Sequence, residues 1–241
     1  MYWLFLIPML LCAVLACSAS AKVHSTYRAQ KEIPTRSHAT GYDTAVRLLR
    51  ANGINDVEVG RVRGELTDHY HPKKKQVNLS AGVFGDDSVA AVAIAAHEIG
   101  HVVQERKGYL PYKLRSILVP ITNLGCRLAL PLVLVGLILD LFVTTAGYSD
   151  LGYYLAIAGV VLYGLSTVFA LVTLPVELNA SKRAKRMLAE EGILTEDELP
   201  YASAMLSAAA QTYVASLLSS LVYFLRFAVW VFLLFGGRRR K

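Results

Sequence analysis

The residues best suited to chemistry are two histidines and a glutamate in one apolar run. His97, Glu98 and His101 lie in "AVAIAAHEIGHVVQ", residues 91–104. Residues four positions apart share one face of an α-helix, so both imidazoles can bind one Zn²⁺ ion. Glu98 then lies beside the metal, where it can take the proton from a metal-activated water that attacks a carbonyl. This is the H-E-x-x-H pattern of zinc peptidases.

The alternative is a core helix whose histidines are merely hydrogen-bonded. That reading needs two histidines and a glutamate in an alanine-rich stripe, each with its own partner. Asp86, Asp87 and Ser88 offer N-caps, so the run should be a helix. Gly108 offers a stop, and Gly100 removes a side chain where substrate or another backbone comes close. The five-residue pattern arises by chance in about one chain in a hundred of this length, which favours a metal site.

A catalytic zinc ion needs a third protein ligand and an open coordination position. Glu177, in "LPVELNASKRA", follows two long apolar runs, 128–146 and 151–174, that are typical of a transmembrane hairpin. A hairpin brings its two flanks together, which returns Glu177 towards His101. A lone glutamate at a helix start is also favoured by the helix dipole alone.

The composition indicates a membrane protein. Of 241 residues, 54% are hydrophobic and 18% charged, and the mean hydropathy is +0.42, unlike a typical soluble domain. The net charge of +7 lies in polar segments beside apolar ones and has no interleaved aromatic residues, so we expect no nucleic-acid partner. The apolar segments long enough to cross a bilayer are 2–21, 128–146, 151–174 and 214–235.

Loop charge predicts the topology. Loops 22–115 and 177–200 are rich in Lys and Arg, whereas the turn near Ser149 has neither. Both loops should therefore be cytoplasmic, which predicts a multi-pass cell-membrane protein with its site on the cytoplasmic side. Four spans would place the tail "RRRK" outside, so either the last segment, which contains Arg226, does not fully cross or the charge bias is overruled there.

The fold class expected is mainly α, a polytopic membrane protein with a compact gluzincin-like catalytic unit. That unit combines the HExxH helix, a small edge sheet and the Glu-bearing helix, with the transmembrane hairpin inserted between the ligand helices. Short strands are expected at 57–62 and 75–80 with a turn-rich loop between them, and a polar helix should begin at Pro175. The parts of this one integrated domain are an anchor (1–21), a catalytic region (22–116), the hairpin (117–174), the Glu-ligand helix and the next helix (175–210), and a C-terminal membrane segment with a basic tail (211–241).

The combination of HEIGH, a hairpin and a Glu-bearing helix resembles the membrane gluzincins, which include the bacterial heat-shock membrane protease and the prenyl-protein endopeptidases. The chain is more similar to the YugP-like family of neutral zinc metallopeptidases, from about Gly41 onward. The stretches that carry this similarity are "LTDHYHP", "VNLS", "AAVAIAAHEIGHVVQ", "LRSILVP", "LVTLPVELNASKRA" and "AAAQTYVA". The resemblance implies one Zn²⁺ bound by His97, His101 and Glu177, with Glu98 as general base. It also implies protein or peptide substrates, including damaged membrane proteins.

One position departs from the broader gluzincins. They place an aspartate four residues after the ligand glutamate, where it orients a histidine, and here that position is Ser181. Asn179 is the alternative source of this hydrogen bond.

Other candidates each have two interpretations. Asp68 and His69, in "TDHYHP", either contact the site or belong to an ordinary turn. "VNLS" is either an edge strand that aligns an extended substrate or an ordinary strand. Tyr213 either stabilises the oxyanion or anchors the helix at the membrane interface.

Two rival functions remain open. Asp140, inside "LVGLILDLFV", is the third-ligand candidate if the protein is a site-2-type intramembrane protease. A non-catalytic zinc-binding membrane protein is the other rival, although structural zinc sites are usually closed and rich in cysteine, and no cysteine lies near His97 in the sequence.

Overall fold

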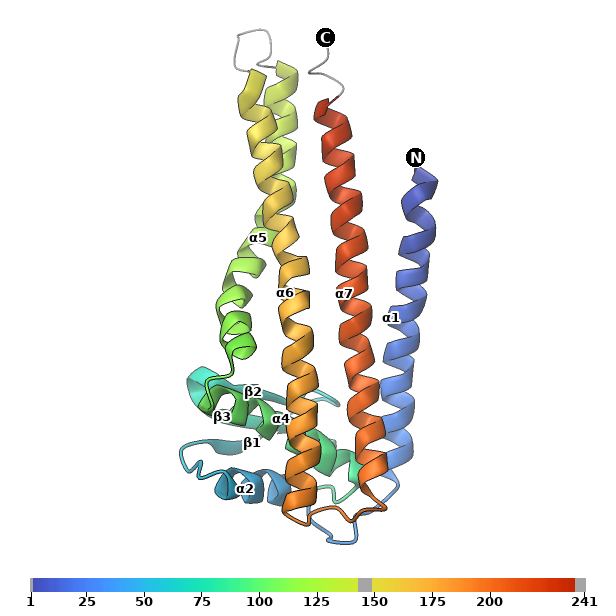
Figure 1. Cartoon of the computed structure of the whole chain (residues 1–241), viewed down its shortest axis with the longest axis vertical. Helices are drawn as coiled ribbons and strands as arrows, with labels where there is room; N and C mark the ends of the chain where they lie inside the picture. The colour runs from blue at the N-terminus through green and yellow to red at the C-terminus, as the bar shows by residue number, and fades with distance from the viewer. Residues whose placement is uncertain (1, 143–148, 237–241) are drawn as a thin grey trace. The chain divides into compact units, whose positions relative to one another are not determined.

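The computed structural model describes residues 2–142 and 149–236, and the side chains of 5–139 and 151–235. The chain is mainly helical, as predicted (Figure 1). The helices are α1 (Tyr2–Lys31), α2 (Gly41–Ala51), α3 (Ala81–Phe84), α4 (Val89–Arg106), α5 (Leu110–Phe142), α6 (Ser149–Glu190) and α7 (Leu199–Gly236). The strands are β1 (Glu58–Val62), β2 (His69–His71) and β3 (Gln76–Ser80), with a 3₁₀ turn, η1 (Pro72–Lys74).

The chain divides into two compact units. The apolar unit consists of Met1–Ala16, Leu114–Leu174 and Val214–Lys241. The polar unit consists of Cys17–Lys113 and Pro175–Tyr213. The finer division into five parts stays a prediction.

Four helices are long and apolar enough to cross a membrane, and each overlaps one of the four segments expected from the sequence. They are Phe5–Lys31, Leu110–Leu139, Leu151–Glu190 and Leu199–Phe235. In the apolar unit, a Cβ on Gly159 of α6 would lie 2.6 Å from the carbonyl oxygen of Ala129 in α5. Such close backbone approach at small residues is typical of helix packing in membranes.

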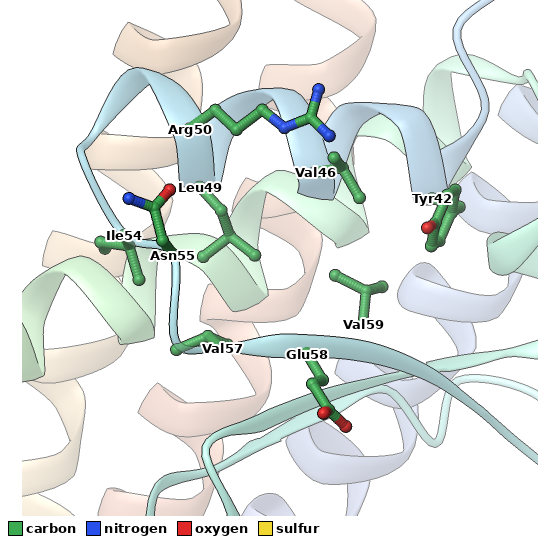
Figure 2. A pocket seen from close by; sticks show the side chains of 9 residues that line it. All are labelled: Tyr42, Val46, Leu49, Arg50, Ile54, Asn55, Val57, Glu58 and Val59. Carbon is green, nitrogen blue, oxygen red and sulfur yellow. The ribbon is translucent and has the colours of Figure 1, made fainter.

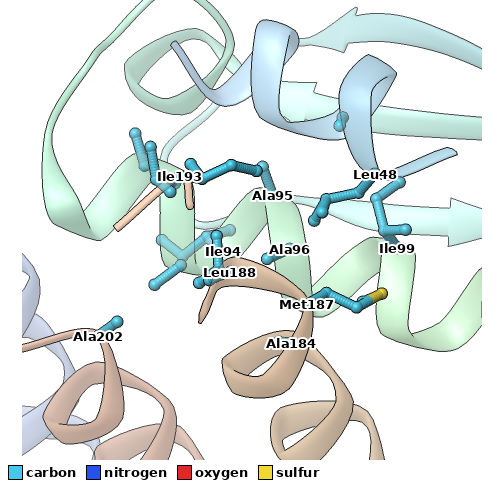
Figure 3. Close-up of a cluster of buried hydrophobic side chains, with 14 of the residues drawn as sticks. Leu48, Ile94, Ala95, Ala96, Ile99, Ala184, Met187, Leu188, Ile193 and Ala202 are labelled. Carbon is cyan, nitrogen blue, oxygen red and sulfur yellow. The ribbon is translucent and has the colours of Figure 1, made fainter. Parts of the chain in front are cut away.

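Helix α4 is buried in the core of the polar unit. Its apolar side chains pack against Leu48 of α2 and Leu188 of α6, together with Ile193 in the segment that follows α6 (Figure 3). A helix that is apolar on all sides is stable only where it is surrounded. The apolar run around HEIGH is therefore explained by burial in this core.

Both ends of α4 follow the sequence signals. The Ser88 hydroxyl accepts a hydrogen bond from the backbone N–H of Ala91, and Gly108 beyond the last turn has a φ of 63°, which favours glycine. Within α4, a Cβ on Gly100 would lie 2.7 Å from the carbonyl oxygen of Ala180 in α6. Gly100 thus permits the close approach of the two helices that carry the candidate ligands.

The sheet corrects two expectations. The strand order is β1-β3-β2, with β3 parallel to β1 and antiparallel to β2. "VNLS" therefore lies in the central strand, and the edge-strand interpretation was wrong. The loop between the two predicted strands contains β2, whose residues His69–His71 pair with Gln76–Asn78. The turn-forming residues on either side of this short segment concealed it.

Pro175 was expected to begin a helix, and this was wrong. It lies inside α6, which continues from Ser149 to Glu190. Proline removes one backbone hydrogen bond, but long apolar helices tolerate this loss. Glu177 therefore lies in the interior of a helix, so the dipole at a helix N-terminus does not explain its presence.

Candidate metal centre

Three side chains of the polar unit converge on one point. His97 and His101 come from successive turns of α4, and Glu177 comes from α6. The Nε2 atoms of His97 and His101 lie 3.2 Å and 3.5 Å from Oε2 of Glu177. The ligand atoms of all three residues lie within 4.8 Å of one another.

This arrangement fits a zinc ion. Ligands held tetrahedrally at about 2.0–2.1 Å from zinc are about 3.4 Å apart, close to the two distances between nitrogen and oxygen. Two imidazoles and one carboxylate are a donor set known from catalytic zinc sites, and three ligands leave one position open. The cluster is also largely buried from solvent, since Glu177 is only 2% exposed.

Glu98 lies next to this cluster in sequence and is buried. Burial raises the pKa of Glu98 to about 7, and the charges of Glu177 and Asp68 add to the shift, while His97 opposes it. A carboxyl group with a pKa near neutrality can both accept and return a proton at physiological pH.

Gln104 orients His101, a role that sequence reasoning missed. Its amide Nε2 donates to the carbonyl of Val176 at 2.7 Å and to Oδ1 of Asn179 at 3.1 Å. Its Oε1 is therefore free to accept from Nδ1 of His101, at 3.1 Å. With the proton on Nδ1, Nε2 of His101 presents its lone pair to the cluster. The available signal was a polar residue one helical turn after His101 in an apolar run.

Asn179 supports this orientation indirectly. Its Oδ1 accepts from Gln104 and from Nε of Arg183, the latter at 2.7 Å. Ser181 contacts the other histidine, because its Oγ lies 3.2 Å from Nδ1 of His97. Each histidine thus has a separate hydrogen-bonding partner on its Nδ1 side.

The remaining candidates have different surroundings. Asp68 accepts hydrogen bonds from the backbone N–H and the hydroxyl of Ser80, at 2.7 and 3.0 Å, and burial raises its pKa. His69 is exposed, and its Nδ1 lies 2.8 Å from the carbonyl of Thr67 while its Nε2 lies 3.3 Å from the amide nitrogen of Asn78 in β3. Tyr213 is half-buried in α7, and its catalytic role stays a prediction.

A separate cleft of about 540 Å³ lies in the polar unit between α2 and β1. Figure 2 shows Val46 and Leu49 from α2 above the strand that carries Val59. This cleft contains none of the residues selected from the sequence. The chemistry-bearing side chains therefore gather at the α4–α6 contact and not at this cleft.

The fold is that of a helical membrane-type protein, and its donor set is of the kind that zinc peptidases use. The chain belongs to a family described as "Putative neutral zinc metallopeptidase", whose model matches residues 2–232. It is 39% identical over 215 residues to "Putative membrane protease YugP" of Bacillus subtilis (strain 168). The aligned region covers 89% of this chain and 90% of that protein. No solved structure is significantly similar to it. Zinc as cofactor and a protease-like class follow from family membership together with the His97–His101–Glu177 group.

Proposed function

We propose that this protein is a membrane-embedded zinc endopeptidase. In this proposal His97, His101 and Glu177 hold the ion and Glu98 is the general base. The observation that carries it is the convergence of three ligand atoms within 4.8 Å, next to a buried carboxyl group whose pKa is about 7.

The protein groups have distinct tasks. When bound, zinc would polarise the scissile carbonyl and make water a stronger nucleophile at neutral pH. Glu98 takes a proton from the attacking water and delivers it to the leaving amine nitrogen. Gln104 and Ser181 hold the two imidazoles in orientation, and Glu177 supplies a negative charge that would offset half the charge of the ion.

The substrate is proposed to be an extended peptide. Strand β2 is an edge of the sheet, and its Tyr70 backbone N–H interacts with the Glu98 carboxylate. A peptide paired with the free side of β2 would bring a peptide bond towards Glu98. This assigns to β2 the alignment role that was first considered for "VNLS".

The bilayer is the proposed environment, with membrane proteins among the substrates and membrane protein quality control as the biological role. Four candidate spans and the similarity to a membrane protease support this setting. The Lys- and Arg-rich loops around α4 and after Glu177 support a cytoplasmic site. In a variant whose three native cysteines, Cys12, Cys17 and Cys126, are replaced by serine, a single cysteine is introduced at exposed Lys73 or Lys107. Treatment of intact cells with an impermeant thiol reagent tests this orientation: protection supports it, and labelling contradicts it.

The proposed activity is tested with Glu98→Gln, which keeps all three ligands. The purified variant should bind as much zinc as the wild type but cleave an unstructured protein substrate at least about 100-fold more slowly. Glu196→Gln, at an exposed position of the same unit, is the control and should cleave normally. Full cleavage by Glu98→Gln would exclude Glu98 as the general base and with it the proposed mechanism.

A further inference from the structure

A second cavity lies within the apolar unit. It has a volume of about 520 Å³ and is lined by residues of four helices, including Phe5 of α1, Cys126 of α5, Tyr163 of α6, and Arg226 and Trp230 of α7. Its wall is mostly apolar and aromatic. Arg226 is the one charged side chain among the described residues that line it.

Arg226 lies within the apolar part of α7. Leu218 and Leu221 precede it and Phe232 and Leu233 follow it, and all four are exposed on the surface of the helix. A charged side chain at such a position is costly and is normally paired or faces a polar cavity. The cation therefore requires a negative partner.

Among the described residues of the apolar unit, no acidic residue lies at this level. Its sequence contains two acidic residues, Asp140 and Asp150. On α5, Asp140 is about 21 Å along the helix from Cys126, and on α6, Asp150 is about 20 Å from Tyr163. Since Cys126 and Tyr163 line the cavity with Arg226, the backbone of neither acidic residue lies at the level of the cavity. Within the described part of the chain, Arg226 forms no ion pair.

We propose that this cavity binds an acidic phospholipid. A guanidinium group matches the geometry of a phosphate, and basic pockets between membrane helices bind anionic headgroups. One acyl chain would lie against the aromatic and aliphatic wall, which includes Leu130, a residue that is 52% exposed. The proposal concerns the apolar unit alone and does not depend on the proposed peptidase activity.

Trp230 in the cavity wall provides a direct probe. The sequence has two tryptophans, so Trp3→Phe leaves Trp230 as the sole fluorophore. The full-length variant is reconstituted in phosphatidylcholine vesicles that contain increasing fractions of brominated phosphatidylglycerol or brominated phosphatidylcholine. We expect the acidic lipid to quench Trp230 with about fivefold higher apparent affinity than the zwitterionic lipid.

Three further substitutions in this background decide the matter. Arg226→Gln should reduce the ratio of affinities to about one, and Arg226→Lys should retain a preference because it keeps the cation. Arg127→Gln removes an exposed arginine of α5 that does not line the cavity, and it should keep the full preference. Quenching by brominated phosphatidylcholine shows in each variant that Trp230 still meets lipid. Equal affinities in the parent, a preference that survives Arg226→Gln, or equal losses in Arg127→Gln and Arg226→Gln would overturn the proposal.

Discussion

At the residue scale, the two histidines are held by different chemical groups. His101 donates to an amide oxygen of Gln104, whose orientation is fixed by two acceptors. His97 meets the hydroxyl of Ser181, which can donate or accept. The contact with Gln104 therefore determines which ring nitrogen of His101 carries the proton. The contact with Ser181 is compatible with either tautomer of His97.

Gln104→Leu removes the acceptor that keeps the proton on Nδ1 of His101. We expect zinc affinity to fall about 10- to 100-fold, because partners of this kind orient the ligand imidazole. Competition with a chromophoric chelator measures the change in detergent solution. The control is Gln211→Leu, the same substitution at an exposed position of α7, and equal affinities for both variants would contradict the assigned role.

At the element scale, the site depends on the contact between α4 and α6. Gly100→Ala would place a methyl group 2.7 Å from the backbone carbonyl of Ala180. Because a backbone cannot yield as a side chain can, we expect a loss of about 1–3 kcal/mol in the free energy of unfolding, with weaker zinc binding. Thermal unfolding and zinc titration measure both effects.

Gly85→Ala is the matched control for Gly100→Ala. A Cβ at Gly85 meets no atom within 4 Å, so this variant should bind zinc and unfold like the wild type. If Gly100→Ala also behaved like the wild type, the close helix contact would not be needed for the site.

Glu198, just before α7, connects two segments of the polar unit. Its carboxylate accepts from the backbone N–H of Arg36 at 2.7 Å and from the N–H and hydroxyl of Thr195, each at 2.8 Å. Burial tends to raise its pKa, but these hydrogen bonds outweigh burial and lower it. The folded state therefore favours the ionised form of Glu198.

Glu198→Gln should lower the free energy of unfolding by about 1–2 kcal/mol at pH 7. The stabilisation is present above the pKa of the unfolded chain, about 4.3, and is lost as the pH falls through the lower folded value. The difference in unfolding midpoint between wild type and variant should therefore shrink between pH 5 and pH 3. Exposed Glu196→Gln is the control, and a difference that grew on acidification would contradict the sign of the shift.

At the scale of the whole molecule, the ion would join segments far apart in the sequence. Zinc bound to the folded state alone should stabilise it by about 2.7 kcal/mol at a free concentration of 100 times Kd. Chelation should therefore lower the unfolding midpoint of the wild type and of Glu98→Gln equally. Glu177→Ala should be insensitive to the chelator, and an equal response in that variant would contradict the prediction.

The sequence predicted the parts of the fold that depend on periodicity and on local signals. The four apolar segments, the capped HEIGH helix and the mainly helical class with a small sheet are such features. The return of Glu177 to His97 and His101 was also predicted, because a hairpin of two apolar runs restricts where the chain can lead.

The sequence-based predictions that were wrong or incomplete concerned features that depend on tertiary context. Pro175 usually marks a helix start, but here the long helix α6 continues through it. Strand β2 has only three residues between turn signals, so it has no detectable periodicity. Gln104 was missed because its role depends on which acceptors its amide meets in the fold. The side chain of Asp140 and the basic tail 238–241 lie outside the described residues, so the expectations about them stay predictions.

The central claim is that Glu177 completes the zinc site, and metal content tests it most directly. Wild-type protein, Glu177→Ala and Asp140→Asn are purified in the same detergent, exposed to equal free zinc, and analysed for zinc per chain. The account predicts about one zinc ion in the wild type and in Asp140→Asn, and almost none in Glu177→Ala. Zinc retained by Glu177→Ala and lost from Asp140→Asn would contradict it and favour the intramembrane type of site.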